Sequence, residues 1–93
     1  MITMLTAASR PALARHVRLT FDAGRDRHVL LSPETVAVLN ATSADILRLC
    51  DGRRTVGEIV AELRDRYDGV AEADVHAFLQ RMAARHCVET VDG

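Results

Sequence analysis

The sequence feature that most constrains the fold is a pair of short apolar runs that lead straight into helix-forming sequence, within Arg27–Gly52. The runs Val29–Leu31 and Val36–Leu39 flank a Ser-Pro-Glu turn, and short runs rich in β-branched residues are typical of strands. After the second run, the sequence predicts a helix over residues 43–51 with Thr42 as its N-cap. A strand that passes directly into a helix favours a small α+β domain, and we expect this strand to lie at a sheet edge.

The residues before this stretch predict one further strand. Residues 16–21 alternate apolar and polar side chains, which indicates a half-buried strand that pairs with residues 27–31 as a hairpin. The 93 residues are enough for one small domain. We expect a single domain over residues 15–91, preceded by a flexible N-terminal arm over residues 1–14.

Two further helices follow. Thr55 and Glu58 form a capping-box pattern at the start of the second helix, and apolar residues at spacings of three and four continue along it. The third helix is expected over residues 72–85, with a β-prone segment over residues 87–91. The predicted fold is α+β and winged-helix-like, with an N-terminal three-stranded antiparallel sheet packed on three helices.

Composition and charge exclude several classes of protein. The net charge of −1 is spread along the chain and gives no electrostatic reason to expect a nucleic acid partner. No run reaches membrane-spanning length, and no secretory signal accompanies Cys50 and Cys87. We expect both cysteines to be reduced, small core residues of a cytoplasmic protein. Apolar residues at the N-terminus, Met1, Ile2, Met4 and Leu5, could contact a second copy, so we expect a monomer or a weak or swapped homodimer.

No pattern of catalytic or metal-ligating residues is visible. The four histidines, His16, His28, His76 and His86, are scattered, and none stands at a ligand spacing with Cys, Asp or Glu. No glycine-rich loop follows a strand to bind phosphate. We therefore expect neither catalysis nor a metal site in this chain.

A winged-helix fold raises DNA binding as an alternative function. In that geometry the first residues of the third helix face the base edges. Here residues 71–74 read Ala-Glu-Ala-Asp, which puts carboxylates where Arg, Lys, Asn or Gln would read bases. The pairs Arg53, Arg54 and Arg81, Arg85 form no broad basic stripe. A DNA-binding regulator stays the alternative from a different functional class.

Peptide binding is the function that the predicted architecture favours. A sheet with an open edge can accept an extended peptide as an added strand. The third helix would form the opposite wall of a groove, although its apolar stripe also serves as core. The predicted contact residues are, on the strand, Val36, Ala37, Val38 and Leu39 and, on the helix, Val75, Phe78, Leu79 and Met82, with Arg81 and Arg85 at the rim.

Several segments of the chain, taken in order, resemble the PqqD family of pyrroloquinoline quinone (PQQ) biosynthesis. Each is weak alone, and together, with family-like spacing, they are distributed over nearly the whole of residues 15–88. The segments are Arg18–Asp22, Val29–Glu34, Leu39–Leu47, Cys50–Val56, Glu58–Val60, Asp74–Val75 and Phe78–Leu79. Two positions depart from the family pattern: Phe21 stands where Trp is frequent, and residues 84–86, Ala-Arg-His, replace a glycine-containing helix end.

The resemblance implies a function. PqqD-like proteins are peptide chaperones that bind the ribosomal precursor peptide PqqA and present it to the radical S-adenosylmethionine enzyme PqqE, which cross-links a Glu and a Tyr of the peptide. It also implies that the groove lies between the third strand and the third helix, and that this protein needs no cofactor. A leader-recognition element of another peptide-modification pathway would share this fold and groove.

Overall fold

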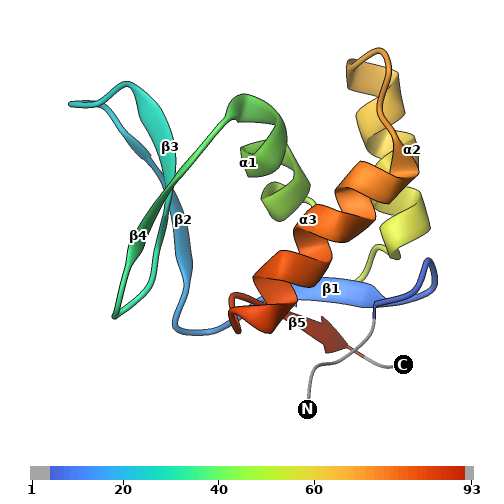
Figure 1. Cartoon of the computed structure of the whole chain (residues 1–93), viewed down its shortest axis with the longest axis horizontal. Helices are drawn as coiled ribbons and strands as arrows, with labels where there is room; N and C mark the ends of the chain where they lie inside the picture. Colours follow the sequence, from blue (N-terminus) through green and yellow to red (C-terminus); the bar gives the residue numbers. More distant parts are fainter. Residues whose placement is uncertain (1–4, 92–93) are drawn as a thin grey trace.

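The computed structural model describes residues 5–91, which form five strands and three helices (Figure 1). The first helix begins at Ala41, directly after a strand. In chain order the elements are β1 (Arg10–Leu13), β2 (Arg18–Asp22), β3 (Arg27–Leu31), β4 (Val36–Leu39), α1 (Ala41–Arg48), α2 (Val56–Arg66), α3 (Glu72–Ala84) and β5 (Val88–Val91).

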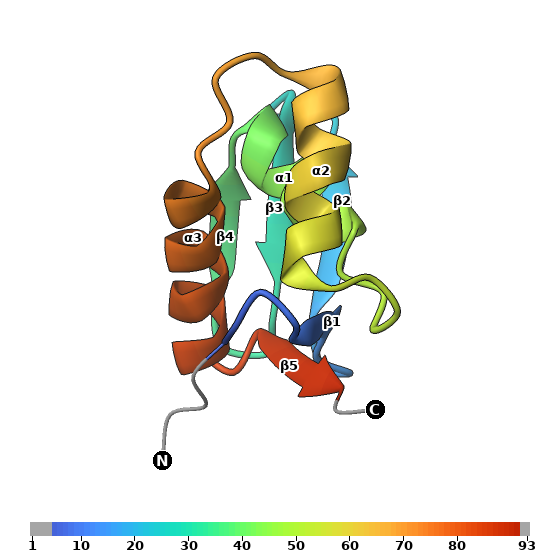
Figure 2. The same ribbon diagram turned by 90° about the vertical axis from the view of Figure 1, so that its right-hand side faces the viewer.

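The strands form two separate antiparallel sheets. The larger has the order β2-β3-β4, which confirms the predicted α+β fold with its three-stranded sheet and three helices. Figure 1 shows this sheet at one side of the molecule, with α1 between it and the pair α2 and α3. In the view turned by 90°, α3 and β4 lie toward one side of the molecule and α2 overlaps α1 (Figure 2). Within the described residues, no helix is long and apolar enough to cross a membrane.

The second sheet was not predicted from the sequence. Strand β1 pairs with β5, so that Arg10 lies opposite Val91 and Leu13 opposite Val88. The flexible arm expected over residues 1–14 is therefore wrong for residues 5–14. Leu5 is only 3% exposed and belongs to the core. The residues Met1, Ile2 and Met4, which the sequence offers as a contact to a second copy, lie outside the described residues.

The N-terminal segment is held by hydrogen bonds to both α2 and α3. The backbone N–H of Leu5 donates to the Gln80 side chain at 3.0 Å, and its carbonyl accepts from Nε2 of His76. Further along, the N–H groups of Val56 and Gly57 at the start of α2 donate to carbonyls of this segment at 2.9 and 3.1 Å. A segment without hydrophobic periodicity is thus fixed through its backbone.

The first turn of α1 differs in its cap from the prediction. Asn40, not Thr42, is the N-cap, and its Oδ1 accepts from the N–H of Ser43 at 2.7 Å. Two polar residues, two positions apart, could each cap this helix, and Asn40 is preferred because β4 ends directly before it. The helix ends at Arg48 rather than at residue 51.

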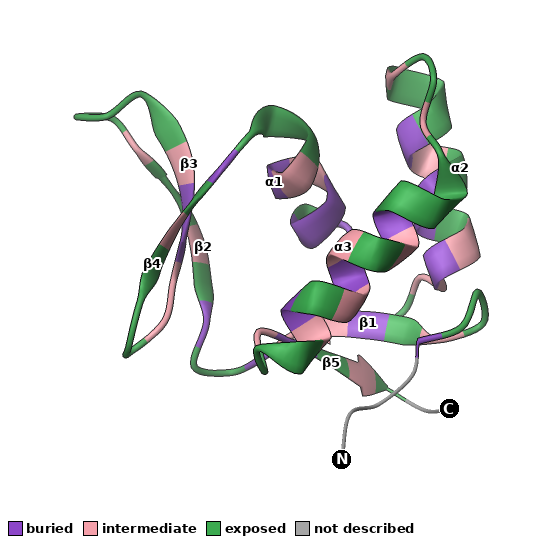
Figure 3. Cartoon of the chain, viewed as in Figure 1, coloured by how far each residue is buried: buried purple, intermediate pink, exposed green. Residues whose placement is uncertain are grey.

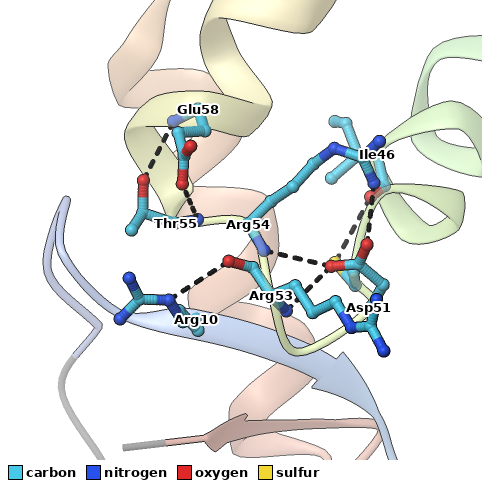
Figure 4. Close-up of polar contacts among 8 residues, drawn as sticks. Arg10, Ile46, Asp51, Arg53, Arg54, Thr55 and Glu58 are labelled. Carbon is cyan, nitrogen blue, oxygen red and sulfur yellow. Dashed lines mark hydrogen bonds and ion pairs between the residues drawn. The ribbon is translucent and has the colours of Figure 1, made fainter. Parts of the chain in front are cut away.

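The start of α2 follows the prediction. Thr55 Oγ1 accepts from the N–H of Glu58 at 3.1 Å, and the Glu58 carboxylate accepts from the N–H of Thr55 at 2.9 Å (Figure 4). These hydrogen bonds lower the pKa of Glu58. In the loop before it, Asp51 accepts from the N–H groups of Arg53 and Arg54, and this lowers the pKa of Asp51.

The core consists of two aliphatic clusters that meet at α1 and α3. One lies between α1, α2 and α3, and the other between α1, the three-stranded sheet and the end of α3 (Figure 3). Phe78 is half-buried and packs against both. Helix α1 contributes Ile46 to the first cluster and Ala44 and Leu47 to the second, so it spaces the sheet from the other helices.

Candidate peptide-binding cleft

Strand β4 is an edge strand, as the sequence predicts. The hairpin from β3 turns through Pro33 and Glu34, and the N–H of Ser32 donates to the carbonyl of Thr35 at 3.0 Å. In an antiparallel pair, hydrogen-bonded and non-hydrogen-bonded residue pairs alternate. Counting from this turn, Ala37 and Leu39 direct their backbone groups toward β3. Val36 and Val38 direct theirs away from the sheet.

The side chains of β4 alternate between the two faces of the sheet. Ala37 and Leu39 face the helices, where both join the second core cluster and Leu39 is only 7% exposed. Val36 and Val38 lie on the opposite face and are 57% and 53% exposed. Of the four predicted strand residues, Val36 and Val38 can therefore contact a peptide through their backbone groups, and Ala37 can do so through its side chain. Leu39 is buried.

The predicted residues of α3 divide in a similar way. Leu79 is fully buried and Val75 nearly so, both in the first core cluster, so they support the helix from inside. Phe78 is half-buried, and the guanidinium carbon of Arg81 lies 5.9 Å from the centroid of its ring. Met82 belongs to the second cluster and faces the sheet.

A cleft of about 310 Å³ separates the start of β4 from the end of α3. We call it the β4–α3 cleft. Its most buried lining residues, Leu30 and Met82, form an apolar floor, and the polar lining residues are more exposed. The lining comes from the sheet, from the loop before β2 and from the end of α3. The lining residues are His16, Leu30, Ser32, Pro33, Glu34, Thr35, Ala37, Met82, Arg85, His86 and Cys87.

A second cleft, of about 380 Å³, lies at the other end of α3, against the first turn of α1. We call it the α1–α3 cleft. It brings together three of the predicted residues, Val75, Phe78 and Arg81, and its edge carries Asp68 and Asp74. The two clefts share α3 as a wall, and β4 runs from the first to Asn40 of the second.

The sequence did not reveal every residue that lines the β4–α3 cleft. His16, Glu34 and His86 come from three different loops, and only their place in the fold brings them together. Leu30 shows no alternation of burial that would have singled it out, because its neighbour Val29 is equally buried. Arg85 was predicted at the rim and does line this cleft.

The two cysteines differ in their surroundings. Cys50 is buried and free, its Sγ donates to the carbonyl of Ile46, and burial together with the Asp51 charge raises its pKa to about 12. Its burial confirms the prediction that Cys50 is a core residue. Cys87 is also free, but it is half-buried and lines the β4–α3 cleft. Within residues 5–91, no three His, Cys, Asp or Glu side chains are grouped to hold a metal ion.

The basic residues give little support to DNA binding. Arg54 forms an ion pair with Asp51 at 2.9 Å, and the N–H groups of Arg53 and Arg54 also donate to that carboxylate (Figure 4). At the first turn of α3, Glu72 and Asp74 are exposed. A duplex approaching this helix terminus would meet carboxylates first.

Comparisons with known proteins agree with this architecture. Residues 27–88 match the family described as coenzyme PQQ synthesis protein D (PqqD). A protein of Rhodopseudomonas palustris strain BisB5, named PqqA binding protein, is 45% identical over 82 residues, which cover 85% of this chain and 80% of that protein. A protein of Pseudomonas aeruginosa strain UCBPP-PA14 with the same name is 43% identical, with coverage of 87% and 90%.

A solved structure is also similar. It is the solution NMR structure of the PqqD truncation of Methylobacterium extorquens PqqCD, described as a functional, stand-alone recognition element for ribosomally synthesized and post-translationally modified peptides. The two chains are 38% identical with a TM-score of 0.77, and the match covers 91% of this chain and 94% of that one. Together, the matched residues, the identities and the shared fold show that this chain belongs to the PqqD family.

Proposed function

We propose that this protein is a peptide chaperone of PQQ biosynthesis that binds the precursor peptide PqqA as an added strand on β4. The observation that carries the proposal is an edge strand with outward backbone groups at Val36 and Val38, beside a cleft with an apolar floor. The names of the relatives as PqqA binding proteins support the identity of the peptide.

The geometry defines how such a peptide would lie. Its backbone would exchange hydrogen bonds with Val36 and Val38, which extends the sheet to four strands. Peptide side chains opposite Ala37 would point into the β4–α3 cleft, toward Met82. Those opposite the two valines would lie on the exposed outer face of the sheet, because directly opposed residues share a face.

The chemistry would then be performed by a partner. We propose that the bound peptide is presented, in the cytoplasm, to a radical S-adenosylmethionine enzyme of the PqqE type, and that this chain makes and breaks no bonds itself. Ordering a flexible peptide costs conformational entropy. The gain for the enzyme is a high effective concentration of substrate, because an adaptor that holds both partners makes capture local.

A pair of proline substitutions tests strand addition. Val38→Pro removes an outward N–H of β4 while it leaves the hydrogen bonds to β3 intact. By the same alternation along β3, Phe21 has its N–H directed outward from β2, at the other edge of the sheet, so Phe21→Pro is the matched control. The readout is fluorescence anisotropy of a labelled synthetic PqqA peptide, with circular dichroism to check that both variants are folded.

We expect Val38→Pro to weaken peptide binding by about tenfold or more, since one backbone hydrogen bond is lost and the ring blocks the next strand. Phe21→Pro should bind the peptide like the unmodified protein. Proline at Ala37 should instead unfold the sheet, because that N–H is bonded to β3. Equal peptide affinity for folded Val38→Pro and Phe21→Pro would exclude an added strand on β4.

A further inference from the structure

The C-terminus of α3 contains a residue in an unusual backbone conformation. His86 has φ +62°, in the left-handed region, and directly follows the C-cap Arg85. The N–H of Cys87 donates to the carbonyl of Met82 at 2.9 Å, and that of His86 to Ala83 at 3.0 Å, which is the hydrogen-bond pattern of a Schellman motif. The residue at this position is most often glycine, because a side chain there costs free energy.

The side chain of His86, which this backbone conformation disfavours, lines the β4–α3 cleft. His86 shares the lining with Arg85 and, from the loop before β2, with His16. All three are exposed, and none has an ion pair or side-chain hydrogen bond to another described residue. The one carboxylate in the lining is that of Glu34, in the turn between β3 and β4, and the thiol of Cys87 is the other titratable group.

The charge of the β4–α3 cleft is set by these ionisable side chains. Arg85 and Glu34 compensate each other, so the cleft has a net charge near zero when both histidines are neutral. The two imidazoles add N–H donors to the lining. The α1–α3 cleft has the opposite character, since Asp68 and Asp74 accompany Arg81 there. The groove along α3 therefore carries one guanidinium and two imidazoles at the start of β4 and an excess of carboxylates at its end.

From this arrangement we infer that His16, Arg85 and His86 form a cationic subsite for an aspartate or glutamate side chain of the bound peptide. The inference rests on the proposed function, because it specifies the side chain that the added strand places in the β4–α3 cleft. An inward-facing peptide residue opposite Ala37 or Thr35 would bring its carboxylate to these three side chains. Charge-assisted hydrogen bonds from imidazolium and guanidinium donors would hold it.

A purely structural explanation makes a different prediction. Cations at a helix C-terminus also interact favourably with the helix dipole, so Arg85 and His86 could serve the stability of α3 alone. If so, His86→Gly should change stability without affecting peptide selectivity. If His86 recognises a carboxylate, the same substitution should stabilise the fold and weaken peptide binding, two effects of opposite sign.

The experiment is a double-mutant cycle between the protein and the labelled PqqA peptide. The protein variants are His86→Gly and, as a control, Arg27→Gln, which removes an exposed cation at the opposite end of β3 from the cleft. In the peptide, each acidic residue is replaced singly by Gln or Asn. Binding is measured by anisotropy at about pH 6 and about pH 8, which bracket the range in which histidine side chains generally change charge and lie above that of carboxylates.

We expect His86→Gly to raise Tm by about 4 °C and to weaken binding of the unmodified peptide by about 3- to 10-fold at the lower pH. One acid replacement in the peptide should cause a similar loss, should not add to that of His86→Gly, and should remove the pH dependence. Arg27→Gln should bind the peptide as the unmodified protein does.

These measurements distinguish a failure of PqqA binding from a failure of the cationic subsite. If the unmodified protein does not bind PqqA at either pH, the proposed function is wrong and this inference falls with it. If the unmodified protein binds but is indifferent to every acid replacement, or if His86→Gly weakens acidic and neutralised peptides equally, the cationic subsite is wrong and strand addition on β4 stands.

Discussion

Gly52 and Gly69 provide a matched pair for measuring how closely strands β1 and β5 approach the loop between α1 and α2. Both have a left-handed backbone, with φ +77° and +72°. They differ in their surroundings: a Cβ at Gly52 would lie 3.2 Å from Cγ2 of Val91 and 3.5 Å from Cβ of Ala12, whereas a Cβ at Gly69 would have no atom within 4 Å. Alanine at the two positions therefore separates backbone strain from packing.

The expected magnitudes follow from these two contributions. Left-handed backbone costs alanine about 1–2 kcal/mol relative to glycine, and a smaller gain of about 0.4–1 kcal/mol comes from the stiffer unfolded chain. Gly69→Ala should thus destabilise by about 1 kcal/mol. Gly52→Ala adds the displacement of Val91, and because that side chain is 47% exposed it can move outward. We expect about 1 kcal/mol more, at the low end for overpacking.

Urea denaturation followed by circular dichroism measures both variants. The Gly52→Ala midpoint should fall below that of Gly69→Ala, with similar m-values, since neither change alters the surface exposed on unfolding. The N–H of Gly52 donates to the carbonyl of Pro11 at 2.9 Å, so the loop cannot simply move away from β1. Equal free energies of unfolding for the two variants would refute the close approach of β1 and β5 to this loop.

Three further predictions concern caps, acid stability and thiol reactivity. Thr55→Ala removes the capping box of α2 and should destabilise by about 1 kcal/mol in urea denaturation. A hydrogen bond from the Tyr67 hydroxyl is the largest cause that lowers the pKa of Asp45 from 3.8. Because the pKa of Asp45 is lowered in the folded state, the ionised carboxylate stabilises the fold fully above pH 3.8. This stabilisation is lost as the pH falls through the lowered pKa. Tyr67→Phe should therefore flatten the loss of stability in this acid range, and an unchanged acid-unfolding profile would contradict it. Cys50 should resist alkylation because its pKa is raised to about 12. Cys87 should react, and bound PqqA peptide should slow that reaction if the peptide occupies the β4–α3 cleft.

The elements that the sequence predicted well are those encoded by residues close together. The capping box of α2 depends on Thr55 and Glu58, three positions apart, and both of its hydrogen bonds are present. The edge position of β4 follows from the apolar runs around the turn at Pro33 and from the helix that starts directly afterwards. Sequence spacing was sufficient because each of these features depends on residues that are close together in the sequence.

The features that the sequence did not predict depend on contacts between distant residues. Strand β1 pairs with β5 across almost the whole chain, and four residues such as Arg10–Leu13 are too few to show a period. The lining of the β4–α3 cleft likewise combines His16, Glu34 and His86 from separate loops. The left-handed conformation of His86 could not be predicted from the sequence either. It is required by the hydrogen bonds that end α3, and the residue type at this position does not indicate it.

The anchoring of α3 explains how the cleft stays open without a peptide. On the side of α3 away from β4, the backbone of Leu5 is bonded to the side chains of His76 and Gln80, and β5 continues from the end of the helix into a sheet with β1. On the side of β4, helix α1 holds the sheet at a distance through the buried side chains of Ala44 and Leu47. Both walls of the cleft are therefore fixed by contacts that a peptide does not have to make. A preformed groove of this kind confines the entropic cost of binding to the peptide itself, and this is what a chaperone for a flexible precursor requires.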